Sequence, residues 1–189
     1  MKKIYLLIIA AAMVAFSSLP TQAATTEFEA VAGLNFSTVD YDGIDFRPGV
    51  HLGVRATWQM PDVTPGFYIN AAGLLSFRGF KADSVSYSPC YLDIPVHAGY
   101  KYDMDGRIAL FAEAGPYVGI GLFGKSEGRD VFSDEVGYKR IDLGLGMRAG
   151  IEFNNRITIS VGGDFGFLRV TDDFSAKPRN LSISVGYKF

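Results

Sequence analysis

The sequence predicts an all-β fold, an eight-stranded antiparallel up-and-down transmembrane β-barrel. Three observations carry this prediction. Apolar and polar residues alternate at period two along eight stretches of the chain. No apolar run after the first segment is long enough for a membrane-spanning helix. The polar connections between the stretches alternate between short and long.

The composition excludes several other classes of protein. A hydrophobic content of 48% is too high for a disordered chain. The one cysteine, Cys90, cannot form an internal disulfide or a multi-cysteine zinc site, and we expect a free thiol without a role. A net charge of -2 argues against a nucleic-acid binder with a strongly basic face. The length of 189 residues suits one domain.

The first segment, residues 1–23, has the pattern of a cleaved secretory signal peptide. Lys2 and Lys3 precede an apolar run from residue 4 to residue 16, and small residues follow at Ala23 and Ala24. The run is shorter than the ~20 residues that a membrane-spanning helix needs. We therefore expect cleavage after Ala23 and a single barrel domain over residues 24–189.

Eight alternating runs make up the rest of the chain. They lie near residues 27–37, 48–59, 66–78, 91–101, 107–122, 138–153, 156–168 and 180–189. The connections at 60–65, 102–106 and 154–155 are short, and those at 39–47, 79–90, 123–137 and 170–179 are longer. This order predicts a meander with a short-turn end and a long-loop end. Pro95 and Pro116 interrupt two runs and predict bulges there.

Two kinds of barrel could use these strands, and they differ in which face points inward. A soluble lipocalin-like barrel buries its apolar face, whereas a transmembrane barrel turns it to lipid. The membrane is favoured because the runs reach the ~9–11 residues of a tilted spanning strand and because glycines gather on the polar face. Aromatic residues also gather at the ends of the apolar face, as in interfacial girdles. The aromatics expected at the short-turn interface are Phe28, Trp58, Phe67, Tyr100, Phe153 and Phe189.

The polar face then lines the lumen. Ionised groups in a narrow interior must pair or stay wet, so the sequence predicts a charge network that blocks most of the lumen. Its expected members are Arg55, Arg78, Asp93, Arg107, Glu113, Arg140, Asp142, Arg148, Glu152 and Asp164. Such a network argues against a general diffusion porin and leaves a narrow ion path open.

No pattern predicts a catalytic, cofactor-binding or metal-binding residue. The glycines of residues 119–124 fit G-x-G-x-x-G, but a dinucleotide site needs a helix after the motif, and none is indicated. His51 and His97, with Asp93 and Ser182 or Ser184, could form a hydrolase acting on lipid, but they point away from the membrane. The acidic residues of the 125–136 loop match no calcium-loop spacing.

Two segments resemble a known family. Residues 91–95, Tyr-Leu-Asp-Ile-Pro, resemble a Tyr-Leu-Glu-Ile-Pro segment, with Asp93 in place of the usual Glu. The final residues 185–189 resemble the aromatic-ended last strand of outer-membrane barrels. The chain thus resembles the outer-membrane β-barrel domain family of Gram-negative bacteria, the small OmpX-like or PorT-like barrels.

The resemblance implies a place in the outer membrane, contact with its lipids, periplasmic termini and outward-facing loops. It also implies recognition by the barrel-assembly machinery through the strand that ends in Phe189. It implies no activity, because such barrels serve many roles. We expect a non-enzymatic structural or surface-interaction protein whose loops carry any extracellular ligand specificity. The alternatives are a narrow porin or transport-related barrel and, less favoured, a lipid-modifying enzyme.

Overall fold

The chain forms a closed β-barrel in a computed structural model. The structure describes residues 26–39, 45–78, 80–82, 85–126, 129–132, 139–168 and 177–189, so the expected signal peptide and its cleavage site lie outside the described residues. Eight long strands build the wall: β1 (Thr26–Val39), β2 (Asp45–Gln59), β3 (Phe67–Phe77), β5 (Val85–Asp103), β6 (Ile108–Ser126), β8 (Ile141–Phe153), β9 (Ile157–Gly166) and β10 (Pro178–Lys188). Two short strands, β4 (Phe80–Ala82) and β7 (Arg129–Asp130), extend the wall at one end.

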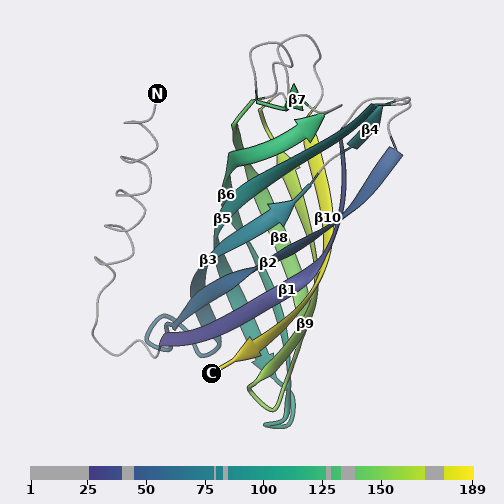
Figure 1. Cartoon of the computed structure of the whole chain (residues 1–189). Coiled ribbons are helices and arrows are strands. Elements are labelled where there is room, and N and C mark those ends of the chain that lie inside the picture. The colour runs from purple at the N-terminus through teal and green to yellow at the C-terminus, as the bar shows by residue number, and fades with distance from the viewer. Residues whose placement is uncertain are drawn as a thin grey trace.

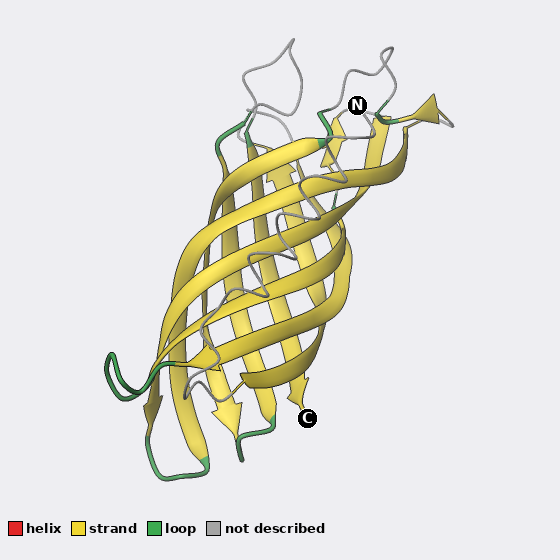
Figure 2. Ribbon diagram, turned by 90° about the vertical axis from the view of Figure 1, so that its left-hand side faces the viewer, coloured by secondary structure: helices red, strands yellow, loops and turns green. Residues whose placement is uncertain are grey.

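Each long strand pairs antiparallel with the next along the chain, and β10 pairs with β1 to close the ring. Figures 1 and 2 show the strands wrapping obliquely around one axis, with the C-terminus at the short-turn end. Closure leaves no unpaired strand edge in the wall. The predicted eight-stranded up-and-down barrel is confirmed. None of the described residues belongs to a helix that could span a membrane.

Local sequence explains the three tight connections. Asn154 and Asn155 have φ angles of 50° and 55°, which two-residue hairpin turns require and which asparagine tolerates. In the β5–β6 turn, Asp103 and Asp105 each accept backbone N–H bonds from the residues that follow. Gly66, with a φ of 87°, ends the β2–β3 turn. These turns lie where the sequence predicts them.

The long-loop end differs from the sequence prediction. The strands β5 and β6 each have 19 residues, and their pairing continues from Tyr102 opposite Leu110 up to Tyr87 opposite Ser126. Much of the predicted connection at residues 79–90 is therefore strand. Period-two alternation reveals a strand only where one of its faces is apolar. The backbone pairing of β5 and β6 continues past the apolar part of the wall, so the alternation does not reveal these ends.

The bulges predicted at the two prolines are wrong. The β5–β6 pairing has the same register on both sides of Pro95, and the β6–β8 pairing runs unbroken through Pro116. Instead, the register of the β5–β6 pairing shifts between Cys90 and Tyr91, where the pairing skips Leu122 of β6. A proline removes one ladder hydrogen bond, but that loss does not require an extra residue in the strand.

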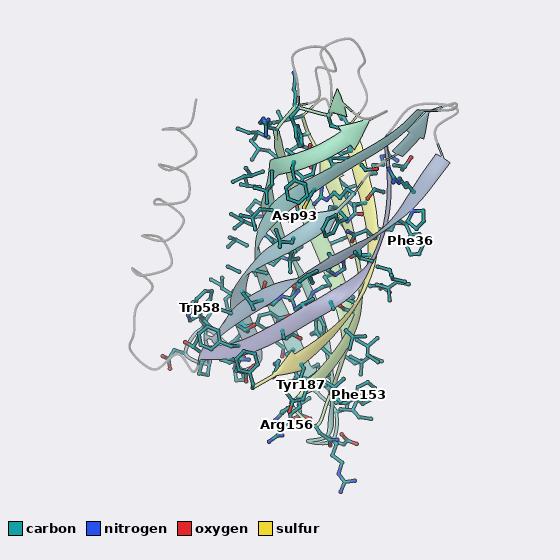
Figure 3. The ribbon with its side chains drawn as sticks, in the orientation of Figure 1. Phe36, Trp58, Asp93, Phe153, Arg156 and Tyr187 are labelled. Carbon is teal, nitrogen blue, oxygen red and sulfur yellow. The ribbon has the colours of Figure 1, made fainter. Side chains whose placement is uncertain are left out.

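The two faces of the wall have opposite character. Outward side chains such as Leu34, Val54 and Val161 are about half exposed (51%, 59% and 60%), whereas Asn35 and Asn70, on the inner face, are 1% exposed. Figure 3 shows side chains projecting outward from both sides of the wall in that view. This arrangement is the inverse of a soluble lipocalin-like barrel and fits an apolar surrounding.

The aromatics that the sequence assigns to one interface all lie toward the short-turn end. Phe67 is opposite Tyr100 at the start of β3, and the backbone N–H of Phe189 donates to the carbonyl of Phe28. Trp58 and Phe153 lie at the ends of β2 and β8, and both are labelled in Figure 3. Their contact with a membrane interface remains a prediction.

We predict that Leu145→Arg destabilises the folded barrel in lipid vesicles by about 2–4 kcal/mol, because the charge enters the middle of the lipid-facing band. Leu145 lies inside β8 with 48% of its surface exposed outward. Urea unfolding in vesicles measures the change. The matched control is Met104→Arg, in the exposed short turn, with an expected cost of ~0–1 kcal/mol. Equal costs for the two variants would contradict the assigned faces.

Candidate functional site: the barrel interior

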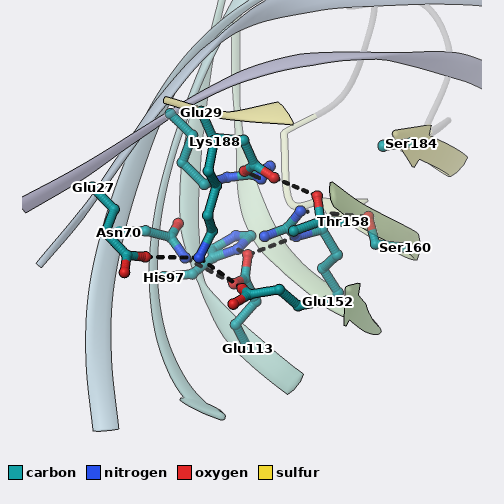
Figure 4. A network of polar contacts seen from close by, with 12 residues as sticks. Glu27, Glu29, Asn70, His97, Glu113, Glu152, Thr158, Ser160, Ser184 and Lys188 are labelled. Atoms are coloured by element: carbon teal, nitrogen blue, oxygen red, sulfur yellow. Dashed lines mark hydrogen bonds and ion pairs between the residues drawn. The ribbon is translucent and has the colours of Figure 1, made fainter. Parts of the chain in front are cut away.

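Polar side chains from all eight long strands meet inside the barrel, and they form layers along its axis. At the short-turn end, the Lys188 ammonium nitrogen lies 2.7 Å from a Glu27 carboxylate oxygen and 2.6 Å from one of Glu152. The Lys101 ammonium nitrogen lies 3.1 Å from the other Glu152 oxygen. Figure 4 shows Lys188 between the two glutamates. This layer ties β1, β5, β8 and β10 together.

The Glu113 carboxylate is the centre of the next layer. Its Oε2 accepts hydrogen bonds from Tyr68 Oη and Asn70 Nδ2, both at 2.7 Å. Its Oε1 accepts from Arg148 Nε at 2.8 Å and contacts His97 Nδ1 at 3.2 Å. Strand register explains the convergence, because Glu113 is opposite Arg148 and Asn70 is opposite His97. Four donors thus hold one carboxylate that is almost fully buried.

A second buried carboxylate, Glu29, lies in the same part of the lumen. It pairs with the Arg55 guanidinium on the adjacent strand and accepts a hydrogen bond from the Thr158 hydroxyl. Gly186 provides the room, because a Cβ there would collide with the Glu29 carboxylate. A glycine beside a large charged residue is the packing that a narrow lumen needs.

Toward the long-loop end, His51 links three strands. Its Nδ1 lies 2.8 Å from Asn35 Oδ1, and its Nε2 lies 2.9 Å from Ser184 Oγ. Asn35 Nδ2 in turn donates to Ser76 Oγ at 2.8 Å, which fixes the amide. Because Asn35 Oδ1 can only accept, Nδ1 carries the proton, and Nε2 of the neutral ring accepts from Ser184. The sequence named His51 and Ser184, but Asn35 became visible as the third member only in the fold.

Arg78 organises the layer nearest the long loops. Its guanidinium forms an ion pair with Asp93, and its Nη1 lies 3.2 Å from an Asp142 oxygen. The guanidinium carbon lies 5.7 Å from the Tyr91 ring centroid and 5.6 Å from that of Tyr117. Tyr117 Oη also donates to Asp142 at 2.8 Å. The cation is therefore held by carboxylates and two aromatic faces.

Phe132, in the β7–β8 connection, packs against the inner face of the wall above this layer. Its ring meets that of Tyr91 edge to face at 5.8 Å, and the guanidinium carbon of Arg140 lies 4.7 Å from its centroid. A Cβ on Gly121 would collide with the Phe132 ring. Phe132 is 9% exposed, so a loop aromatic fills this part of the interior.

Little space remains between the layers. The upper cavity, on the long-loop side, has a volume of about 50 Å³ and the lower cavity one of about 20 Å³. Glu113 and Arg148 line both cavities, so their ion pair lies at the partition between them. Cavities of this size hold a few water molecules.

Most of the charged residues that the sequence assigned to the lumen do lie there. Those in ion pairs of the described network are Arg55, Arg78, Asp93, Glu113, Asp142, Arg148 and Glu152. Asp164 lines the upper cavity and accepts a hydrogen bond from Asn180 Nδ2 at 3.0 Å. Arg140 lies at the long-loop end against Phe132 and the Gly121 carbonyl. Arg107 is misassigned, since it lies in the exposed β5–β6 turn.

Two groups of interior residues were not singled out from the sequence. The first are uncharged partners, such as Asn70 and Thr158, which donate hydrogen bonds to Glu113 and Glu29. Phe111 and Tyr91 are aromatic but point inward, and the Arg148 guanidinium carbon lies 4.8 Å from the Phe111 centroid. Their positions in the period-two alternation match those of the inward-facing residues. Their aromatic type alone, however, suggests the outward, apolar face.

The other motifs show no site within the described residues. The glycines of residues 119–124 lie within β6, which continues as a strand to Ser126. The helix that a dinucleotide site needs therefore does not directly follow them. No group of three or more His, Cys, Asp or Glu side chains in the described ranges converges to hold a metal ion. Glu127, Asp134 and Glu135 of the acidic loop lie outside the described residues. Cys90 is buried in β5 as a free thiol.

Comparison with known proteins gives the class. Residues 8–189 match the family model "Outer membrane protein beta-barrel domain", and the chain belongs to this family. It is thus an outer-membrane β-barrel protein of the Gram-negative type, in contact with the lipids of that membrane. A search of curated protein sequences finds no match.

Among solved structures, the chain is similar to Neisserial surface protein A, with 14% identity, a TM-score of 0.60, and coverage of 89% of this chain and 100% of that one. It also matches Ail, the attachment invasion locus protein of Yersinia pestis, in complex with the heparin analogue sucrose octasulfate. That match has 18% identity, a TM-score of 0.49, and coverage of 87% and 99%. The outer membrane enzyme PagL matches with 16% identity, a TM-score of 0.45, and coverage of 87% and 99%. At these identities the first likeness supports the fold alone.

We predict that Arg148→Met destabilises the barrel by about 3–5 kcal/mol, because it leaves the buried Glu113 carboxylate without its cation. Urea unfolding in lipid vesicles measures the loss. The double variant Arg148→Met with Glu113→Gln should recover part of it, since no unpaired charge remains. Arg156→Met, in the exposed β8–β9 turn, is the control, with an expected change within about 0.5 kcal/mol. Strict additivity in the double variant would contradict the pairing.

Proposed function

We propose that this protein is a non-enzymatic outer-membrane barrel with a structural or surface-interaction role. Its long-loop end faces outward, and its polar lumen is largely plugged. The observation that carries the proposal is the interior itself: cross-linked layers of ion pairs and hydrogen bonds span the lumen, and the two cavities among the described residues of these layers measure about 50 and 20 Å³. A lumen filled in this way leaves the loops as the part that can meet a partner.

The short-turn end then faces the periplasm. The C-terminal Phe189 lies at that end and is 77% exposed, so its ring is available to a partner. Its strand, β10, is also the one that closes the ring against β1. These two features support recognition of the last strand by the barrel-assembly machinery before closure. The connections at this end are tight turns, so little of the chain extends beyond the wall on the periplasmic side.

We predict that the protein forms no steady channels in planar lipid bilayers, because the ion pair of Glu113 and Arg148 blocks the lumen. Replacing both with alanine, which removes the partition between the two cavities, should raise the conductance well above that of the wild type. Single-channel recording in KCl measures both proteins.

The matched control replaces two exposed charges in short turns, Asp62→Ala with Arg156→Ala, and should stay closed. Steady channels in the wild-type protein would instead support the second candidate, a narrow porin or transport-related barrel. The two small cavities in series are the observation that favours that candidate.

The third candidate is a lipid-modifying enzyme, and one arrangement favours it. Ser184, His51 and Asn35 form the chain of nucleophile, base and orienting group that acyl-transfer enzymes use. However, the Ser184 hydroxyl borders a cavity of about 50 Å³, whereas ligand pockets measure roughly 300–1,000 Å³. A lipid acyl group has no room there, so hydrogen bonding between strands accounts for the arrangement better.

We predict that a fluorophosphonate probe does not label Ser184 in the folded protein, because the serine is buried within the lumen. Mass spectrometry of the treated protein detects the adduct, and Ser184→Ala is the blank. Lipid analysis of membranes with and without the protein should show no acyl change. Labelling of Ser184, or an acyl change that His51→Ala abolishes, would overturn the non-enzymatic assignment.

A further inference from the structure

At the level of His97, the inner face of the wall carries a cross-strand row with two glycines in it. Asn70 of β3 is opposite His97 of β5. A Cβ on Gly115 of β6 would lie 2.9 Å from the His97 Cα, so this glycine is the next position along the row. Gly115 is opposite Gly146 of β8, which in turn is opposite Asp164 of β9. Two strands therefore separate His97 from Asp164, and neither carries a side chain at this level.

The missing side chains let the imidazole ring and the carboxylate approach each other. A Cβ on Gly146 would lie 2.8 Å from His97 Nε2 and 2.9 Å from Asp164 Oδ1, so both atoms border the same small space. Any other residue at position 146 would fill that space with its own side chain. Both His97 and Asp164 also line the upper cavity of about 50 Å³, which gives the two side chains room to close the remaining distance.

His97 has a partner on one side of its ring only. Its Nδ1 lies 3.2 Å from a Glu113 carboxylate oxygen, and because a carboxylate only accepts, Nδ1 carries the proton. Nε2 has no hydrogen-bond partner among the described residues, although His97 is 6% exposed. Asp164 accepts a hydrogen bond from Asn180 through Oδ2, and its other oxygen is the one that borders the space above Gly146. With a neutral ring, a lone pair therefore faces a carboxylate oxygen.

We propose that His97 and Asp164 form a proton-operated link across the lumen. When the imidazole takes up a second proton, Nε2 becomes a donor and the Asp164 carboxylate that it faces becomes its acceptor. The imidazolium is then held between two carboxylates, Glu113 and Asp164, and β5 is tied to β9 over the two glycines. Because the link exists only while His97 is charged, it stabilises the barrel at acidic pH and is lost as the pH rises. This switch is independent of the proposed surface role.

Other charged and titratable groups face His97 from the strands around it. They are His51, Arg55, Arg78, Asp93, Glu113, Tyr117, Asp142, Arg148 and Asp164. Arg55 and Arg148 pair with buried glutamates, and Arg78 pairs with two aspartates. Both ring nitrogens of His51 already have partners. Among these groups, Asp164 is therefore the acceptor that faces the Nε2 atom of His97.

The test is a double-mutant cycle on the detergent-folded full chain, with the melting temperature measured at about pH 5.5 and about pH 8. His97→Asn keeps an N–H donor toward Glu113 and removes Nε2, whereas Asp164→Asn keeps the shape of its side chain and removes the charge. We expect Asp164→Asn to lower the melting temperature by roughly 3–6 °C more at the acidic pH than at the alkaline one. In the His97→Asn background this extra loss should disappear, because no imidazolium remains. Asp62→Asn, in an exposed turn, makes the same charge change and should show no extra loss.

A second readout follows the proton directly and works in the wild-type protein. The chain has two histidines, so labelling with ¹⁵N-histidine gives an NMR spectrum of two rings, and His51→Asn assigns them. Nε2 of His97 should change from an unprotonated to a protonated nitrogen between about pH 8 and about pH 5.5. In Asp164→Asn the same change should need a lower pH, because the carboxylate no longer favours the charged ring. In Asp62→Asn it should occur at the wild-type pH.

Three outcomes would overturn the proposal. The first is an Asp164→Asn loss that is the same at both pH values, with and without His97. The second is protonation of His97 Nε2 at the same pH in the wild type and in Asp164→Asn. The third is a rise in melting temperature on acidification that is equal in all four proteins of the cycle, which places the pH response on the aspartates around Arg78 instead.

Discussion

The backbone's need for hydrogen-bond partners in hydrocarbon is the constraint on which the rest of this structure depends. Lipid offers no partner to a free N–H or C=O group, so a β-sheet can cross a membrane only as a closed ring. Pairing of β10 with β1 meets this need and joins the two ends of the chain. Closure at eight strands also sets the lumen width, and that width forces the interior to be filled by side chains.

The interior must then hold a large number of charges in a small volume. Two of its layers do so with matched pairs, and the bonds run between neighbouring strands or across the lumen. Such pairs add little net stability, because desolvation offsets much of their attraction. The third layer, around Arg78, differs, because the two carboxylates Asp93 and Asp142 share one guanidinium.

Two features of the interior bear on function: a serine–histidine–asparagine chain and the ion pair between the two cavities. The Ser184, His51 and Asn35 chain shows that catalytic-looking geometry arises when small polar residues on adjacent strands satisfy one another. On the proposed function the arrangement is a strand-to-strand link, because the cavity beside Ser184 measures about 50 Å³. The ion pair of Glu113 and Arg148 lines both cavities and lies between them. The proposed surface role accordingly places any partner at the ends of the barrel, above all at the loops.

The sequence by itself determined the strand count, the tight turns and the inward or outward direction of nearly every side chain, because period-two alternation and turn residues are local signals. It also placed Arg78 and Asp93 inside. It could not determine that Arg107 lies in a turn, that β5 and β6 extend into the loops, or that Pro95 leaves the register intact. Only the tertiary structure decided which interior groups meet, such as Gly146 opening space for His97 and Asp164, because strand register and closure bring together residues far apart in the chain.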